Sequence, residues 1–371
     1  MRILIAPDSF KGTLTAREVC DIIGEAFKEV IPDCEITKLP AADGGEGLCA
    51  CLYDILGGKR LTAEVCGVFP DSRVRAEYIM LPDKTAVIEM SACAGLPLAG
   101  ERKNPLKTTT YGVGELLLDA KKNGAKKILL GLGGSATNDC GAGMAAALGW
   151  KFLDENAKEF IPVGESLINI RKIEKTETDY SLPVTAACDV TNPLFGKNGA
   201  AFVFAPQKGA DAEAVDLLDR GLQNIADVIY RDLGLSVAEK AGAGAAGGMG
   251  AGVHAFLSAS LKSGANILLD AANFEKKCQN ADLVVTGEGR LDSQSADGKV
   301  ISCVALRAEK LGKRVIAVCG SKGDGAEKIS GCGIEKAYFA VNVDKSFAEI
   351  LASCRCDLYT AAEKAAKDYK T

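Results

Sequence analysis

The sequence contains a single histidine, His254, and no pair of cysteines separated by two residues. Ser–His, Cys–His and imidazole acid–base mechanisms would all depend on that one side chain, which lies in the apolar stretch Val253–Leu257. We therefore expect a packing role for His254 and assign acid–base chemistry to carboxylates and lysines. The 14 cysteines lack the clustered spacing of a zinc site and are predicted to be small buried hydrophobes in a reducing cytoplasm.

Long apolar runs and basic blocks are also missing. No run approaches the ~20 residues that a membrane span requires. The apolar start Met1–Ala6 is followed at once by Asp8 and Lys11, which is unlike a signal peptide. A formal net charge of −5 with scattered lysines and arginines argues against a partner with a phosphate backbone. We expect a cytoplasmic protein that binds neither membranes nor nucleic acids.

Several familiar nucleotide and hydrolase signatures are absent. The sequence has no Walker A loop, no HRD or DFG triplet and no G-x-S-x-G elbow. Gly242–Gly252 opens with G-x-G-x-x-G, but Val237–Ala241 before it is interpreted as a helix end rather than a strand, so the dinucleotide fingerprint is rejected. We predict a close-packing glycine hinge or an anion loop there, ahead of a helix over Val253–Leu261.

The most distinctive stretch that is present is Gly131–Met144, which follows the predicted buried strand Ile128–Leu130. Glycines let the backbone approach a ligand, and the N–H groups at the start of a following helix attract anions. The stretch is either an anion site or a tight turn in which Asn138 or Asp139 caps the helix. In the first interpretation, the anion and an associated cation would be held by Gly133, Gly134, Ser135, Thr137 and Asp139.

Similar strand–loop–helix junctions recur at both ends of the chain. Arg2–Ala6 and Cys34–Leu39 predict strands, Thr15 and Glu18 form a possible capping box at the first helix, and the alternation returns from Ala281. This pattern predicts a parallel sheet with right-handed crossovers, in which ligands bind at the carboxyl ends of the strands. The loops at these ends carry Asp8, Ser9, Lys11, Asp43, Glu46, Glu288, Arg290, Asp292 and Lys299.

The pattern changes in the middle of the chain, where Arg60–Val68 and Arg73–Leu81 flank a turn and predict a hairpin. We therefore predict an α/β protein with two α/β domains. A doubly wound parallel-sheet domain is built from both chain ends, 1–58 and 280–371, and a mixed α/β domain, 59–279, is inserted between them. Residues 108–149 fit either domain.

The strand-end loops combine carboxylates, lysines and an arginine with glycine-rich backbone. Several carboxylates beside a backbone that cradles phosphate indicate Mg²⁺ and a nucleotide. Phosphoryl transfer requires mainly positioning, charge stabilisation and a carboxylate that orients or deprotonates a hydroxyl. Asp189, which follows the predicted strand Pro183–Ala187, and Lys208 belong to the same set of charges.

Seven segments, in order along nearly the whole chain, resemble the type I glycerate kinase family. They are APDSFKG (Ala6–Gly12), ADGGEG (Ala42–Gly47), GLGGSATND (Gly131–Asp139), CDVTNPLFGKNGAA (Cys188–Ala201), APQKGA (Ala205–Ala210), GAGAAGGMGAG (Gly242–Gly252) and GEGRLDSQSADGK (Gly287–Lys299). The resemblance implies ATP-dependent phosphorylation of D-glycerate with Mg²⁺, to 2-phosphoglycerate or alternatively 3-phosphoglycerate. It also implies a flavodoxin-like domain with an inserted domain. Cys140 departs from the family, which usually has glycine there, and Val300–Cys303 replaces a Pro-x-Gly stretch.

Within this resemblance we assign roles to the loop residues as hypotheses. Asp189 is the first choice for the base or hydroxyl-orienting group, and Asp43 is the second. The remaining assignments are glycerate binding by Asp8, Ser9, Lys11 and Arg290, nucleotide binding by Gly133, Gly134, Ser135, Thr137 and Glu288, and metal binding by Asp139 and Asp292. The alternatives are a non-catalytic sugar-acid binding protein, a kinase for another small hydroxy acid and a metal-dependent nuclease. We expect a monomer or a homodimer.

Overall fold

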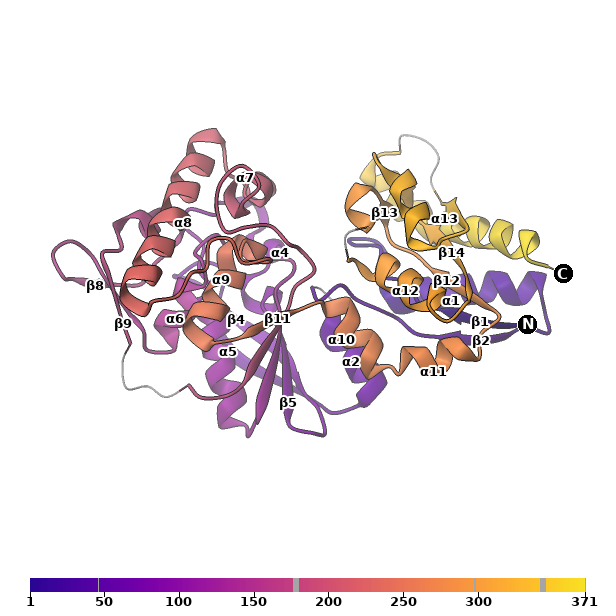
Figure 1. Cartoon of the computed structure of the whole chain (residues 1–371), viewed down its shortest axis with the longest axis horizontal. Helices are drawn as coiled ribbons and strands as arrows, with labels where there is room; N and C mark the ends of the chain where they lie inside the picture. Colours follow the sequence, from indigo (N-terminus) through magenta and orange to yellow (C-terminus); the bar gives the residue numbers. More distant parts are fainter. Residues whose placement is uncertain (46, 176–179, 297, 341–344, 371) are drawn as a thin grey trace. The chain divides into compact units, whose positions relative to one another are not determined.

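The computed structural model describes residues 1–45, 47–175, 180–296, 298–340 and 345–370, which form two compact units (Figure 1). The first unit comprises Met1–Asp43, Ala50–Ile55 and Ser263–Thr371. The second comprises Gly44–Cys49 and Leu56–Lys262. Residues 108–149, which the sequence assigned to neither domain, lie in the second unit.

The first unit is built on a five-stranded parallel sheet with the order β16-β14-β12-β1-β2. Its strands are β1 (Arg2–Ile5), β2 (Glu35–Lys38), β12 (Leu283–Thr286), β14 (Arg314–Cys319) and β16 (Lys336–Phe339). Counted along the chain, this order is the flavodoxin-like 2-1-3-4-5, in which the direction of winding reverses between β1 and β12. The prediction of a parallel sheet made from both chain ends is confirmed.

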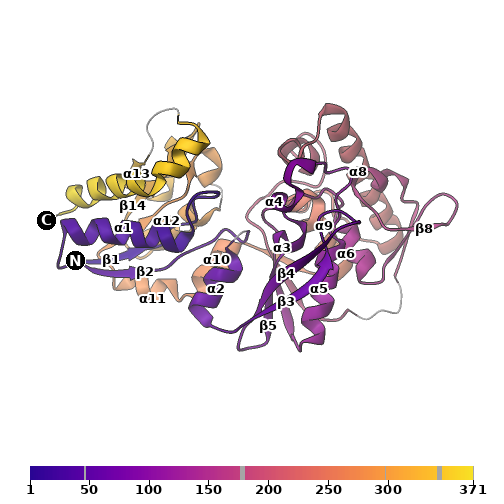
Figure 2. The same ribbon diagram turned by 180° about the vertical axis from the view of Figure 1, so that it is seen from behind.

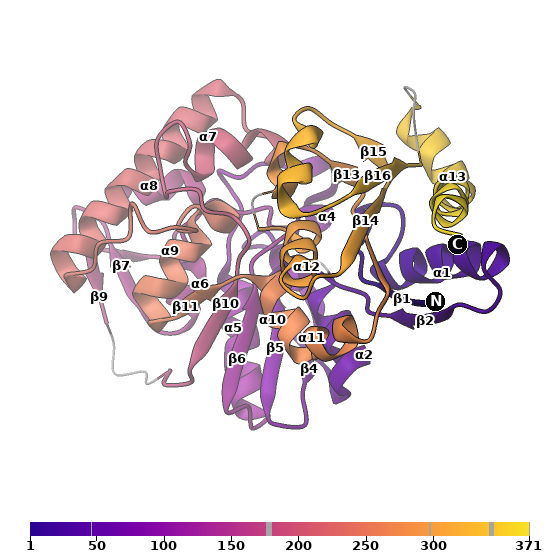
Figure 3. The same ribbon diagram turned by 45° about the vertical axis from the view of Figure 1, so that its right-hand side comes forward.

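Helices cover both faces of this sheet (Figure 3). One face is covered by α1 (Ala16–Val30) and α13 (Phe347–Asp368), which pack side by side. The other is covered by α12 (Val300–Glu309), with α10 (Gly264–Ala271) and α11 (Phe274–Gln279) beside it. Because right-handed crossovers on either side of the reversal place their helices on opposite faces, this layering follows from the strand order.

Helix α1 begins where the sequence predicts. The Thr15 hydroxyl accepts a hydrogen bond from the Glu18 N–H at 3.2 Å, and the Glu18 carboxylate accepts one from the Thr15 N–H at 3.0 Å, so the predicted capping box is confirmed. The buried side of the helix places Val19, Ile23 and Phe27 in the apolar core between α1 and the parallel sheet. Burial of each such side chain contributes about 1.5–3 kcal/mol.

The second unit contains a mixed six-stranded sheet with the order β11-β10-β6-β5-β4-β3 (Figure 2). β3 (Lys59–Cys66) and β4 (Arg73–Met80) form the predicted hairpin, and β5 (Thr85–Glu89) pairs antiparallel with β4. The remaining strands are β6 (Lys127–Gly131), β10 (Val184–Ala187) and β11 (Ser260–Lys262). The pairs β5–β6, β6–β10 and β10–β11 are all parallel.

Two apolar cores hold the second unit together. The first lies between its sheet and α5 (Tyr111–Lys122). The second joins α6 (Ala142–Ala147), α8 (Ala212–Leu233) and α9 (Ala245–Leu257). It also packs against a small antiparallel sheet of β7 (Lys151–Leu153), β8 (Glu159–Phe160) and β9 (Lys172–Glu174). Short helices complete both units at Leu48–Leu56 (α2), Ser91–Ala94 (α3), Leu96–Ala99 (α4) and Ala200–Phe204 (α7).

The structure differs from the expectations in three segments. Helices α10 and α11 belong to the first unit, because Arg307 of α12 pairs with Asp270 and Glu275 at 2.7 and 2.5 Å. The helix predicted over Val253–Leu261 is wrong in its bounds, since α9 starts inside the glycine run and ends at Leu257. The segment Val237–Ala241 is neither a helix end nor a strand. Among the described residues, no helix is both long enough and apolar enough to cross a bilayer.

Candidate functional site

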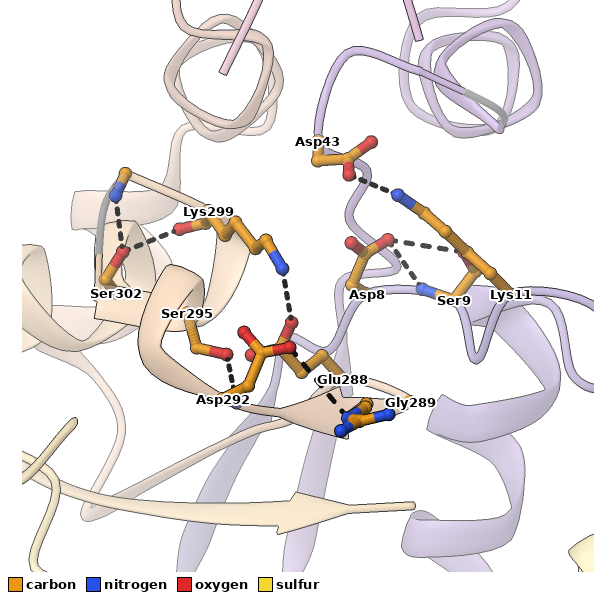
Figure 4. A network of polar contacts seen from close by, with 12 residues as sticks. Asp8, Ser9, Lys11, Asp43, Glu288, Gly289, Asp292, Ser295, Lys299 and Ser302 are labelled. Atoms are coloured by element: carbon orange, nitrogen blue, oxygen red, sulfur yellow. Dashed lines mark hydrogen bonds and ion pairs between the residues drawn. The ribbon is translucent and has the colours of Figure 1, made fainter. Parts of the chain in front are cut away.

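A cavity of about 310 Å³ opens in the first unit at the carboxyl ends of β1 and β12, where the winding reverses. Flavodoxin-like sheets bind their ligands at this position. The cavity brings together most of the predicted site residues of this unit (Figure 4). Its polar lining includes Asp8, Ser9, Lys11, Thr13, Asp43, Glu288, Arg290, Asp292, Lys299, Ser321 and Asp357, and its apolar lining includes Phe10, Phe347 and Ile350.

Asp8 lines this cavity from the loop that follows β1. Its N–H donates to the Gly287 carbonyl at 2.8 Å, and its Oδ1 accepts from the Ser9 N–H at 2.7 Å. The residue is only 4% exposed. Burial, and then the negative charges of Asp43 and Glu288, raise the pKa of Asp8 to about 8 against the opposing effect of Lys11.

Two ion pairs lie on either side of Asp8 (Figure 4). On one side the Lys11 ammonium pairs with the Asp43 carboxylate. Partial desolvation lowers the pKa of Lys11, but Asp43 and Asp8 raise it by more, so Lys11 is held in its cationic form. On the other side Lys299 Nζ lies 3.7 Å from Glu288 Oε2, and burial raises the pKa of Glu288.

The loop after β12 can follow this path only because it contains glycine. A Cβ atom at Gly287 would lie 1.9 Å from the Val318 carbonyl oxygen of β14, which no side chain tolerates. The loop then forms the short strand β13 (Arg290–Leu291), which pairs with β15 (Ser321–Lys322). This pairing presents Arg290 at the cavity, where its side chain is 67% exposed. The Nε atom of Arg290 lies 4.0 Å from Oδ2 of Asp292.

The glycine-rich loop after β6 lies in the second unit. A Cβ atom at Gly133 would approach Gly45 Cα to 2.3 Å, and Gly134 has φ +74°, so both positions require glycine for the backbone itself. Lys208 Nζ donates to Ser135 Oγ at 2.9 Å and to the Thr137 carbonyl at 2.7 Å. Burial lowers the pKa of Lys208 to about 7, although Asp139 opposes the shift.

Asp139 is fully buried, and both of its carboxylate oxygens accept hydrogen bonds. Oδ2 accepts from the N–H and the hydroxyl of Thr110 at 2.7 and 2.8 Å and from the Gly143 N–H at 3.3 Å. Oδ1 accepts from the Gly141 N–H at 3.2 Å. These bonds join the start of α5 to the start of α6, as in the interpretation of the loop as a capped turn. The role of Asp139 as a metal ligand stays a prediction.

Among the other candidates, Asp189 follows β10 in the second unit and does not line this cavity. Glu46 lies outside the described residues. His254 contacts Lys240 Nζ at 3.3 Å and the Ala259 carbonyl at 3.4 Å. Cys140 has φ +53°, so the position where the family usually has glycine is indeed left-handed.

Two lysines were given no role from the sequence. Lys299 lines the cavity beside Glu288, and Lys208 anchors the loop in the second unit. In the sequence, both lysines lie in segments that resemble the family. Lys299 is the last residue of GEGRLDSQSADGK, and Lys208 lies within APQKGA. The apolar surroundings of Lys208 in APQKGA were an additional sign of burial.

The carboxylates of the cavity fit a Mg²⁺ ion that arrives with a nucleotide. Across the described ranges, no group of three or more His, Cys, Asp or Glu side chains converges as a complete protein metal site. Mg²⁺ typically takes one or two carboxylates and completes its shell with water and substrate phosphates. Glu288 Oε1 is buried without a hydrogen-bond partner among the described residues, so it is available for such a ligand, and Asp292 lines the same cavity.

The sequence matches the family model described as "Glycerate kinase family" over residues 3–370. The chain belongs to the glycerate kinase family. It is 45% identical to the glycerate kinase of Halalkalibacterium halodurans over 91% of this chain and 90% of that protein. It is also 45% identical to the glycerate 2-kinase of Escherichia coli, over 91% of this chain and 90% of that protein. The predicted family, and with it the kinase class, is confirmed.

A solved structure supports the same fold for this member of the glycerate kinase family. The crystal structure described as glycerate kinase 2 from Salmonella typhimurium LT2 superposes with a TM-score of 0.82 at 40% identity. The match covers 100% of this chain and 98% of that chain. The predicted α/β fold class, with a flavodoxin-like parallel sheet and a second mixed sheet, is therefore confirmed for the whole chain.

Proposed function

We propose that this protein transfers the γ-phosphoryl group of ATP to a hydroxyl of D-glycerate and releases ADP and 2-phosphoglycerate. The observation that carries the proposal is the cavity at the reversal of the parallel sheet, which combines buried carboxylates with Lys11, Lys299 and Arg290. A small hydroxy acid needs cations for its carboxylate, and a nucleotide triphosphate needs cations and Mg²⁺. Relatives named glycerate kinase and glycerate 2-kinase support the same substrate.

Lys11 and Arg290 are proposed to bind the carboxylate of glycerate, with Asp8 and Ser9 beside its hydroxyl groups. Arg290 is well exposed at the cavity, and its guanidinium can donate two parallel hydrogen bonds to a carboxylate. Lys11 already binds the carboxylate of Asp43, so glycerate would replace or share that partner. The existing ion pair holds the ammonium of Lys11 in place before substrate arrives.

Glu288 and Asp292 are proposed to hold Mg²⁺ with the phosphate oxygens of ATP. The ion would neutralise charge on the transferring phosphoryl group. Lys299 is proposed to assist, because its ammonium lies beside Glu288. In the second unit, the loop of Gly133, Gly134, Ser135 and Thr137 stays the predicted phosphate cradle.

The cellular setting is also a proposal. We place the enzyme in the cytoplasm, where ATP and Mg²⁺ are available, and we expect it to act as a monomer or a homodimer. We propose a small-molecule substrate as its ligand, with neither nucleic acid nor membrane as a partner. The net charge of −5 supports the proposal that the protein does not bind nucleic acid.

Phosphorus NMR of the purified protein with Mg-ATP and D-glycerate tests this function. We expect a new phosphomonoester signal together with ADP. The proton coupling of that signal distinguishes phosphate on carbon 2, which we expect, from phosphate on carbon 3. ATP that stays intact in the presence of D-glycerate would contradict the proposal. ATP consumption that needs a different hydroxy acid would correct the substrate alone.

A further inference from the structure

Asp8 differs from every other carboxylate that lines the cavity of the first unit. Asp43, Glu288, Asp292 and Asp357 each form an ion pair, with Lys11, Lys299, Arg290 and Lys345 respectively. Within the described part of the chain, Asp8 forms no ion pair. Its Oδ1 accepts from the N–H and, at 3.4 Å, from the hydroxyl of Ser9, whereas its Oδ2 has no hydrogen-bond partner among the described residues.

The position of Asp8 suits contact with a small bound acid. It lies in the loop that follows β1, at the reversal of the winding, and is only 4% exposed, yet it lines the cavity. The cations proposed to bind glycerate, Lys11 and Arg290, line the same cavity. Figure 4 shows Asp8 between the Lys11–Asp43 pair and the Lys299–Glu288 pair. The Oδ2 atom of Asp8 is therefore open to a hydroxyl bound among these cations.

We propose that Asp8, rather than Asp189 or Asp43, accepts the proton of the substrate hydroxyl during phosphoryl transfer. This inference rests on the proposed function and adds the identity of the proton acceptor. Asp43 is less suited, because the ammonium of Lys11 already occupies its carboxylate. Burial and the charges of Asp43 and Glu288 make Asp8 a stronger base than an ordinary aspartate, as general base catalysis near neutral pH requires.

In the transfer step, the hydroxyl proton moves to Oδ2 of Asp8 while the hydroxyl oxygen forms a bond to the γ-phosphorus of ATP. The bond between the γ-phosphorus and its bridging oxygen breaks, and the electron pair leaves with ADP. Asp8 is then protonated, and it returns the proton to solvent after the products leave. The step needs no reactant other than ATP and the hydroxy acid.

Steady-state kinetics of Asp8→Asn with Mg-ATP and D-glycerate test the inference. We expect kcat to fall about 100- to 10,000-fold, because asparagine keeps the shape and the Ser9 contact but accepts no proton. The KM values should change far less, since the cations that bind substrate remain. Asp21→Asn is the matched control, which removes a carboxylate paired with Lys38 in the same unit but outside this cavity and should change kcat less than about threefold.

Wild-type turnover separates the two proposals. If the wild-type enzyme forms no ADP with D-glycerate, the proposed function fails. If it is active and Asp8→Asn turns over within tenfold of it, the function stands and the inference is overturned. A loss in Asp189→Asn with normal Asp8→Asn would return the role to Asp189.

If both variants lose activity, the pH profile of kcat decides which residue is the base. We expect the acidic limb to be absent in Asp8→Asn and retained in Asp189→Asn. The reverse pattern would overturn the inference. Should Asp8→Asn fail to fold, Asp8→Glu keeps the question open to test. It retains a carboxylate and should recover part of kcat with the acidic limb, and loss of that limb would contradict the role of Asp8.

Discussion

At the scale of single residues, the buried carboxyl of Asp8 makes folding stability depend on pH. Its pKa is about 8 in the folded protein against an ordinary value of 3.8, so the folded state binds the proton more tightly. The stability from this proton is complete below pH 3.8 and is lost as the pH rises through 8. We expect Asp8→Asn to gain stability relative to wild type by on the order of 3 kcal/mol between pH 5 and pH 8.

Urea unfolding of both proteins at the two pH values measures this gain. A variant with lower activity and higher stability at pH 8 is the result expected of a charge that is kept for chemistry rather than for folding. A difference in unfolding free energy that does not change with pH would show that Asp8 is ionised throughout.

Lys208 has the opposite pH dependence. Burial lowers its pKa from 10.5 to about 7, so its contribution to stability is present above pH 10.5 and is lost as the pH falls through 7. We expect wild type to gain about 2–3 kcal/mol over Lys208→Met between pH 7 and pH 9. Urea unfolding at both values measures it, with the exposed Lys126→Met as the control. An equal pH response in Lys208→Met and wild type would contradict the assignment.

At the scale of elements, the start of α9 is fixed by contact with the loop that follows β6. Gly247 has φ +71°, and a Cβ atom there would lie 2.0 Å from the Thr137 carbonyl oxygen and 2.6 Å from Asn138 Cα. We expect Gly247→Ala to destabilise the protein by about 3 kcal/mol or more, because strain and steric overlap add. Unfolding in urea measures the loss.

Gly234 provides the matched control for that substitution. It ends α8 with φ +70°, and a Cβ atom added there would have no neighbouring atom within 4 Å. Gly234→Ala therefore introduces the backbone strain without the overlap and should cost about 1 kcal/mol. Equal losses in the two variants would show that packing against Thr137 and Asn138 contributes nothing.

Local patterns in the sequence predicted the elements that depend on neighbouring residues. The capping box of Thr15 and Glu18 and the β3–β4 hairpin each involve residues close in the chain, and both are confirmed. The start of α9 was not predictable, because the left-handed turn at Ala246–Gly248 is held against Thr137–Cys140, about a hundred residues away. The hydrogen bond between Thr110 and Asp139 was not predictable either, because the two residues are 29 positions apart in the sequence.

At the scale of the whole molecule, alternation of strands and helices at both chain ends predicted the sheet, and the loops after its strands predicted where the charged residues gather. The position of Asp8 between two ion pairs was not predictable, because the Lys11–Asp43 pair belongs to the N-terminal part of the sequence and the Lys299–Glu288 pair to the C-terminal part. That α10 and α11 belong to the first unit was not predictable for the same reason, because Arg307, which pairs with Asp270 and Glu275, lies more than 30 residues later in the sequence.

The discontinuous first unit leads to a prediction about fragments. Residues 44–262 contain all six strands of the mixed sheet and both apolar cores of the second unit. Residues 263–371 keep β12, β14 and β16 but lack β1, which pairs with β12, and α1, which packs on α13. We expect 44–262 to unfold cooperatively in urea and 263–371 to show no cooperative transition, as followed by circular dichroism. A peptide of residues 1–55 should restore the transition of 263–371, because it supplies β1, β2 and α1. A cooperative transition of 263–371 alone would show that β1 is dispensable and that the unit does not need both chain ends.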